Sequence, residues 1–85
     1  MHYSGVLVRS IPHRLDECID QVNACEGVDV YLRHDDVSSL VAVIESQTLA
    51  GQEDQLRAVQ DLSAVAAADL VYHRSDDEEE LENWS

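Results

Sequence analysis

The chain has 85 residues, enough for one domain and near the lower limit at which a chain buries a core without disulfides or metals. Eighteen Asp and Glu face five basic residues, all arginine, which gives a formal net charge of −13. This charge repels nucleic acids and anionic lipids and attracts cationic partners. It disfavours nucleic-acid binding and makes a basic peptide or basic protein face the expected partner. The simpler alternative is that the acidity only keeps a small protein soluble.

The cysteines and the N-terminal residues indicate a reduced, cytoplasmic protein. On one helix, Cys18 and Cys25 would lie about 10 Å apart along the axis, too far for a disulfide. We therefore expect free thiols, as in the cytosol. The first residues lack the basic region of a signal peptide, and no stretch approaches the roughly 20 apolar residues of a membrane helix.

The first third of the chain predicts a strand followed by a helix. Residues 4–11 read as a strand, with an apolar run between Gly5 and Pro12. Pro12 suits the first turn of a helix, where its missing N–H is harmless. Apolar residues then recur at helical spacing, at Leu15, Cys18, Ile19, Val22 and Cys25. Gly27 is expected to end this helix.

The remainder predicts a hairpin, a helix and a last strand. Residues 28–33 alternate between apolar and polar, as in a half-buried strand, and 40–45 are nearly all apolar. The short polar connection between these strands predicts an antiparallel hairpin. A helix is expected over about 49–62, capped by Ser46 or Thr48, and a strand over 65–73.

The resulting order, β-α-β-β-α-β, predicts an α+β fold of the ferredoxin-like, split βαβ type. Its four-stranded antiparallel sheet would carry both helices on one face and leave the opposite face uncovered. We expect this domain to occupy residues 1–75. Residues 76–85 hold six acids and are predicted to form a disordered tail.

The residues that carry catalysis or bind cofactors are missing from this pattern. The four histidines lie in different predicted elements, and neither cysteine has a metal-ligand partner at short spacing. No glycine-rich loop is present to bind phosphate, and no serine lies in the glycine-rich elbow that would hold a catalytic nucleophile. The sequence therefore predicts a binding protein rather than an enzyme, with no metal and no cofactor.

Four stretches together resemble the NapD family, the cytoplasmic chaperones of periplasmic nitrate reductase assembly: residues 4–8, 26–30, 40–45 and the closing Leu-Val-Tyr-His at 70–73, followed by acids. The resemblance implies a ferredoxin-like fold and binding of the twin-arginine signal peptide of the catalytic molybdoenzyme subunit. It implies that export is delayed until the cofactor of that subunit is inserted. Two residues depart from the family pattern, Ala64 and Asp69, and Asp69 could alter the binding surface.

Strand alternation predicts which side chains would meet such a peptide. The side packed against the helices is assigned Val6, Val8, Val28, Val30, Leu32, Leu40, Ala42, Ile44, Ala68 and Leu70. The uncovered side is assigned a predicted peptide site of Leu7, Tyr31, Val41, Val43, Glu45, Asp69, Val71 and His73, with Arg9, Asp29 and Arg33 on the same side. An apolar centre rimmed by acids suits an amphipathic basic helix.

Three alternatives remain open at this stage. The apolar residues on the uncovered side could be ordinary surface residues or a dimer contact. A one-residue error of register would exchange the two sets. The rival function is a ferredoxin-like regulatory module that binds a small effector between two copies. Such a module needs a glycine-rich turn after the first strand to admit the effector. This chain has Ser10, Ile11, Pro12 and His13 there, which argues against the rival function.

Overall fold

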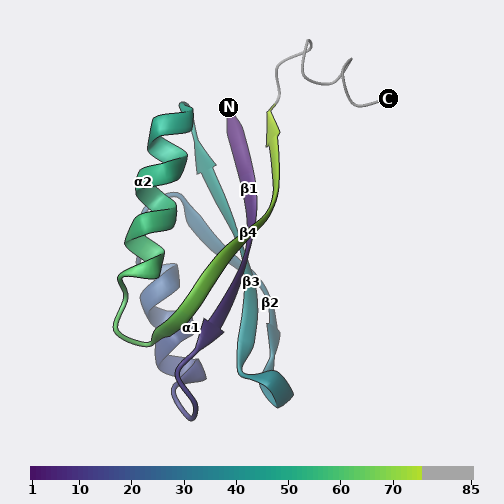
Figure 1. The fold of residues 1–85 in the computed structure, drawn as a ribbon, viewed down its shortest axis with the longest axis vertical. Helices are drawn as coiled ribbons and strands as arrows, with labels where there is room; N and C mark the ends of the chain where they lie inside the picture. Colours follow the sequence, from purple (N-terminus) through teal and green to yellow (C-terminus); the bar gives the residue numbers. More distant parts are fainter. Residues whose placement is uncertain (76–85) are drawn as a thin grey trace.

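The computed structural model describes residues 1–75 of the chain (Figure 1). In chain order the elements are β1 (His2–Ser10), α1 (Leu15–Asn23), β2 (Val28–His34), a short 3₁₀ helix η1 (Asp35–Val37), β3 (Ser39–Ser46), α2 (Leu49–Gln60) and β4 (Val65–Ser75). The predicted order of strands and helices is confirmed. The predicted disordered tail, 76–85, lies outside the described residues.

The four strands form one antiparallel sheet in the order β2-β3-β1-β4. Figure 1 shows both helices on the same side of this sheet. The predicted hairpin of β2 and β3 is confirmed, and β1 lies between β3 and β4 because each helix carries the chain back across the sheet. This leaves the second face of the sheet without a covering layer in the described part of the chain.

The core lies between the helices and the inner strands β1 and β3. Eight core side chains of the helices and inner strands are at most 1% exposed: Val6, Val8, Cys18, Val22, Leu40, Ala42, Ile44 and Val59. These side chains are small, so the layers approach closely without large aromatic groups. Burial of this aliphatic surface is the principal stabilising contribution to the fold.

The start of α1 differs from the prediction that Pro12 occupies its first turn. Residues 12–13 form a tight turn instead, in which His13 has a φ of 68°. The N–H of Arg14 donates to the C=O of Ile11 at 3.0 Å, which closes this turn before α1 begins at Leu15. At the other end α1 stops at Asn23, four residues before the predicted stop at Gly27. Gly27 has a φ of 75°, in the left-handed region that favours glycine, and leads into β2.

The second helix is anchored by its N-cap and by a buried amide. The predicted cap at Thr48 is confirmed, because its Oγ1 accepts from the N–H of Gly51 at 2.9 Å. One turn in, Gln52 is 5% exposed. Its Nε2 donates to the C=O groups of Ile44 and His2, each at 2.9 Å, and its Oε1 accepts from Ser4 Oγ. Gln52 therefore connects α2 to both inner strands.

Each outer strand contains a β-bulge, where one extra residue interrupts the alternation of side chains. In β2 the pairing passes from Val30 with Ala42 to Leu32 with Val41, so Tyr31 is the extra residue. In β4 the pairing passes from Leu70 with Val6 to Tyr72 with Gly5, so Val71 is the extra residue. A second shift in β4, between the partners of Arg9 and Ser10, leaves Ala66 as another.

Candidate functional site

The uncovered side of the sheet is the candidate site, and β1 and β3 define its centre. Along both strands fully buried side chains alternate with partly exposed ones. Leu7 pairs with Val41, and the next pair along the same face joins Gly5 to Val43. With their cross-strand partners, these residues form the open face: Tyr3, Gly5, Leu7, Arg9, Asp29, Leu32, Ser39, Val41, Val43, Glu45, Ala67, Asp69, Tyr72 and Arg74.

Five members of the predicted peptide site lie on the open face: Leu7, Val41, Val43, Glu45 and Asp69. Leu7 is central, because it pairs with Val41 on one side and with Asp69 on the other. Its side chain, like those of Val41 and Val43, is half-buried. The structure thus brings an apolar centre and a carboxylate together, and their contact with a peptide stays a prediction.

The assignments within β2 are wrong beyond the bulge. Tyr31 is 74% exposed and has no partner in the register with β3. Leu32, assigned to the helix side, pairs with Val41 and lies on the open face. Arg33, assigned to the open face, pairs with Leu40 and donates from Nη2 to Asp16 of α1 at 2.9 Å. The extra residue at Tyr31 exchanged the two faces from that point on.

The assignment of His73 to the open face is also wrong, for the same reason. The bulge residue Val71 is exposed, and beyond it the even-numbered side chains reach the open face. His73 pairs with Ser4 on the helix side, where its Nε2 lies 3.2 Å from Nδ1 of His2. Tyr72 and Arg74 take its place on the open face, opposite Gly5 and Tyr3.

Tyr72 is a large aromatic side chain of the open face that the sequence reasoning missed, as it missed Tyr3. The ring of Tyr72 occupies the space that a Cβ at Gly5 would fill. With Tyr3, Val43 and Arg74 it lines a shallow hollow at one end of the face. The signal was Gly5 itself, because a glycine inside a strand often marks the close approach of another group.

A second hollow lies at the other end of the open face. Leu7 and Arg9 of β1 form one side of it, and His34, Val37 and Ser39 around the β2–β3 turn form the other. Val37 is exposed. The open face therefore carries a hollow on either side of its apolar centre, with an arginine in each.

The charges around the apolar centre of the open face are mixed rather than only acidic. Asp29, Glu45 and Asp69 are accompanied by Arg9 at one end and by Arg74 at the other. Within residues 1–75 neither arginine forms an ion pair with these acids. Cations and anions on this face are therefore both accessible to a ligand.

Two ionisable groups outside the open face have structural roles. Hydrogen bonds to Asp35 and Asp16 raise the pKa of Arg33, which joins β2 to α1. Burial raises the pKa of the Cys18 thiol, so this side chain is a neutral part of the core. Among residues 1–75, no three metal-ligating side chains gather in one place, and no helix has the length and apolarity to cross a membrane.

A four-stranded antiparallel sheet with two helices on one face and the order β2-β3-β1-β4 defines a ferredoxin-like domain. The sequence profile of the family described as NapD protein matches residues 1–77, so the chain belongs to the NapD family. The same fold occurs in the solution structure of the E. coli Tat proofreading chaperone protein NapD. The two sequences are 22% identical, and the match has a TM-score of 0.78 and covers 89% of this chain and 80% of the E. coli chain. The comparison with curated proteins finds no match.

Proposed function

We propose that this protein is a cytoplasmic chaperone that binds a twin-arginine signal peptide on the open face. The peptide is that of the catalytic, molybdenum-containing subunit of periplasmic nitrate reductase, and binding delays its export until the cofactor is inserted. The observation that carries the proposal is an uncovered sheet face with an apolar centre and accessible acids, in a member of the NapD family. The E. coli NapD protein, which has the same fold, is a Tat proofreading chaperone, and this supports the assignment.

The chemistry of a twin-arginine leader fits this face. Such a peptide combines cationic side chains with an apolar stretch. The apolar stretch would lie over Leu7, Val41 and Val43, with the ring of Tyr72 beside it, and its burial would supply most of the affinity. The arginines would pair with carboxylates of the same face, and Asp69 beside Leu7 is the most central of these.

The arginines of the open face would restrict how the peptide lies. Arg74 occupies the row of Glu45 and Tyr3 near one end, and Arg9 lies near the other. Like charges repel, so the cationic end of a leader would avoid both positions. Asp69 lies beside Leu7, two rows along the open face from Arg74, and its carboxylate favours a cation there. A chaperone of this kind needs no catalytic group.

The experiment is a calorimetric titration of the protein with a synthetic twin-arginine leader of a nitrate reductase from the same source. Val43→Glu places a carboxylate under the apolar stretch and is expected to weaken binding about tenfold or more. Ala58→Glu is the matched control, because Ala58 is an exposed residue of α2 and the added charge is the same. It is expected to leave the affinity within about twofold of the unmodified protein.

Salt separates the charged and apolar parts of the interaction. Charges at this surface are screened over roughly 8–10 Å at physiological ionic strength, so raising the salt should weaken leader binding without abolishing it. An affinity independent of salt would remove the charged contacts from the proposal. Full-strength binding by Val43→Glu, with the fold intact by circular dichroism, would show that the leader lies elsewhere.

A further inference from the structure

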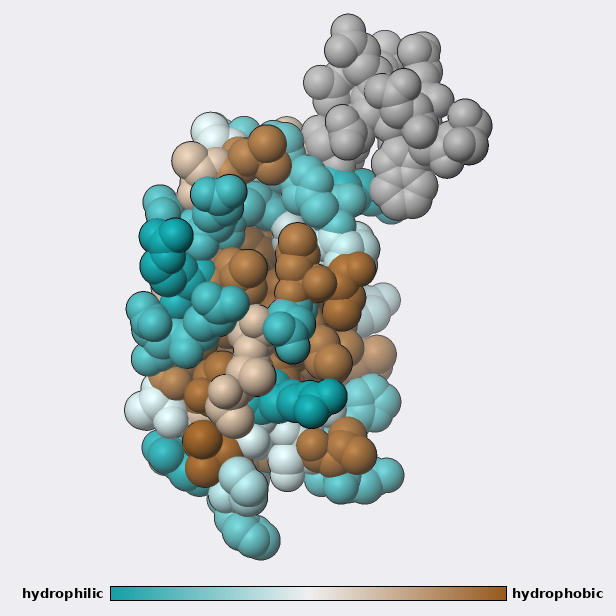
Figure 2. Space-filling view, in the orientation of Figure 1, coloured by the Kyte–Doolittle hydropathy of each residue, from teal (hydrophilic) through white to brown (hydrophobic). Residues whose placement is uncertain are grey.

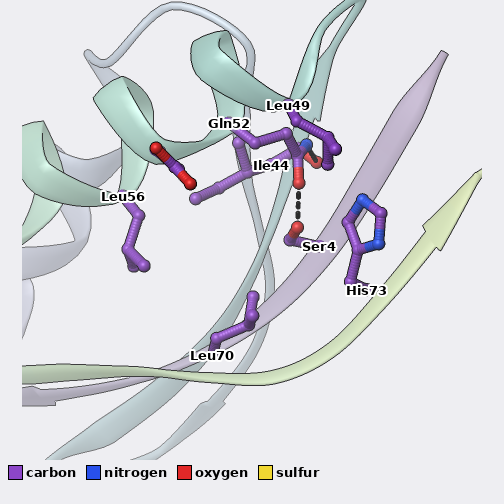
Figure 3. A pocket seen from close by; sticks show the side chains of 8 residues that line it. Ser4, Ile44, Leu49, Gln52, Leu56, Leu70 and His73 are labelled. Atoms are coloured by element: carbon purple, nitrogen blue, oxygen red, sulfur yellow. Dashed lines mark hydrogen bonds between the residues drawn. The ribbon is translucent and has the colours of Figure 1, made fainter.

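A separate recess lies on the helix side of the sheet, between α2 and the outer strand β4. Figure 2 shows apolar surface gathered between these two elements. In Figure 3, Leu49 and Leu56 reach into the recess from α2, and Leu70 reaches in from β4. Ile44 forms its floor, and the polar groups of Ser4, Gln52 and His73 lie at one end. We call this recess the α2–β4 groove.

The α2–β4 groove has space for an apolar side chain. Its volume is about 180 Å³, and apolar cavities of similar volume bind a group the size of benzene. Leu49 and Leu70 are 55% and 51% exposed, although both belong to regular elements beside the core. An apolar group placed between them would bury surface that the described part of the chain leaves in water.

Among residues 1–75, the backbone beside the groove belongs to an edge strand of the sheet. β4 is the outermost strand, and one side-chain amide protects its edge: Gln60 Nε2 donates to the C=O of Ala68 at 3.0 Å. From Leu70 to Arg74, β4 pairs with β1 on one side, and within residues 1–75 no other hydrogen bond to its backbone is formed. An edge of this kind accepts a further strand through main-chain hydrogen bonds.

The charge beside the groove is negative. Glu53 contributes a carboxylate to its lining, and no arginine lines it. The whole chain carries −13. A strand that enters this groove is therefore favoured when it carries Lys or Arg beside its apolar residues.

We propose that the α2–β4 groove is a second polypeptide-binding surface. An extended cationic segment adds to the outer edge of β4 as a fifth strand, with an apolar side chain in the pocket and a Lys or Arg beside Glu53. The groove opens on the helix side of the sheet, so this surface is distinct from the open face. The inference does not depend on what the open face binds, and the two surfaces can be occupied together.

A second copy of the chain is the occupant that the charges oppose. Joining two β4 edges would bring together two chains of −13 each. Six Asp and Glu residues of each chain follow Ser75 in the sequence, directly after the strand that would form the contact. The mutual repulsion favours a basic partner over self-association.

The test uses the full chain and a labelled ten-residue peptide in which valine alternates with arginine. We expect saturable binding by fluorescence anisotropy, and slowed amide hydrogen exchange between Leu70 and Arg74. Leu70→Ser removes one wall of the pocket and should weaken binding about tenfold. Glu53→Gln keeps the shape of the side chain, removes its charge and should weaken binding about two- to fivefold. Neither change should alter leader binding at the open face.

Control peptides and variants make the outcome decisive. Replacing the arginines of the peptide by glutamate should abolish binding, and a central proline should do the same because it cannot complete a ladder. If Leu70→Ser fails to fold by circular dichroism, Leu49→Ser tests the opposite wall. Unchanged binding by the groove variants, loss of binding in Val43→Glu, or dimerisation through β4 in sedimentation would each overturn the proposal.

Discussion

The ring of Tyr72 in β4 occupies the space beside Gly5 in β1 that any side chain at position 5 would need. Gly5→Ala should therefore displace the ring without unfolding the domain, because Tyr72 is about half exposed and can turn outward. We expect a loss of about 1–2 kcal/mol in the free energy of unfolding, measured with urea. Leader binding should weaken as well, since the hollow formed with Tyr3 and Val43 changes shape.

The control for this prediction is a double-mutant cycle with Tyr72→Ala. Without the ring, Gly5→Ala meets no obstacle and should cost less than in the unmodified protein. Equal costs in both backgrounds would show that the ring and the glycine do not interact.

Adjacent residues of β3 should respond oppositely to the same substitution. Ile44 is 1% exposed, and Ile44→Glu would bury a charge in a domain whose total stability is of the order of 5 kcal/mol. We expect that variant to be unfolded by circular dichroism. Val43→Glu places its carboxylate on the open face and should remain folded. The reverse result would mean that the two faces of the sheet are assigned the wrong way round.

Gln52 should be among the most sensitive polar residues to replace. Gln52→Leu leaves the C=O groups of His2 and Ile44 and the hydroxyl of Ser4 without this partner, and the side chains of Gln52 and Ser4 are both buried. The expected loss in unfolding free energy is about 2 kcal/mol or more. Gln60→Leu is the matched control, because it removes one bond at an exposed position and should cost about 1 kcal/mol or less.

The buried thiol of Cys18 should make stability fall at alkaline pH. Burial raises its pKa, so the folded chain keeps a proton that the unfolded chain releases above about pH 8.5. The folded state binds more protons in that range, and stability declines as pH rises through the raised pKa. Unfolding with urea at about pH 7 and about pH 9.5 should show a smaller gap between wild type and Cys18→Ala at the higher pH. A constant gap would contradict the prediction.

The inner strands were predictable because their alternation is strict. Every other side chain of β1 and β3 is buried under the helices, and a one-residue slip would expose Val6 or Ile44 to water. Because such a slip would lose core burial, the sequence alone places Leu7, Val41 and Val43 on the open face. Asp69 followed because it lies before the bulge in β4, in register with Leu7.

The outer strands could not be assigned in this way because a bulge leaves no simple mark in the pattern. Leu32 and His73 continue an alternation that their strands break at Tyr31 and Val71. Both bulge residues are exposed, so no loss of core packing signals the shift. Leu70 was placed on the correct side, but its half exposure depends on the position of α2, which a strand pattern does not contain.

The bulges separate the parts of the open face that can vary from those that cannot. A residue gained or lost at position 31 or 71 would exchange which side chains the end of an outer strand presents, while Val6, Val8 and Ile44 would keep their packing. New combinations of charge and ring around the apolar centre are thus reachable by single insertions or deletions in the two outer strands. Such a domain can therefore change the leader that it prefers while its core packing stays the same.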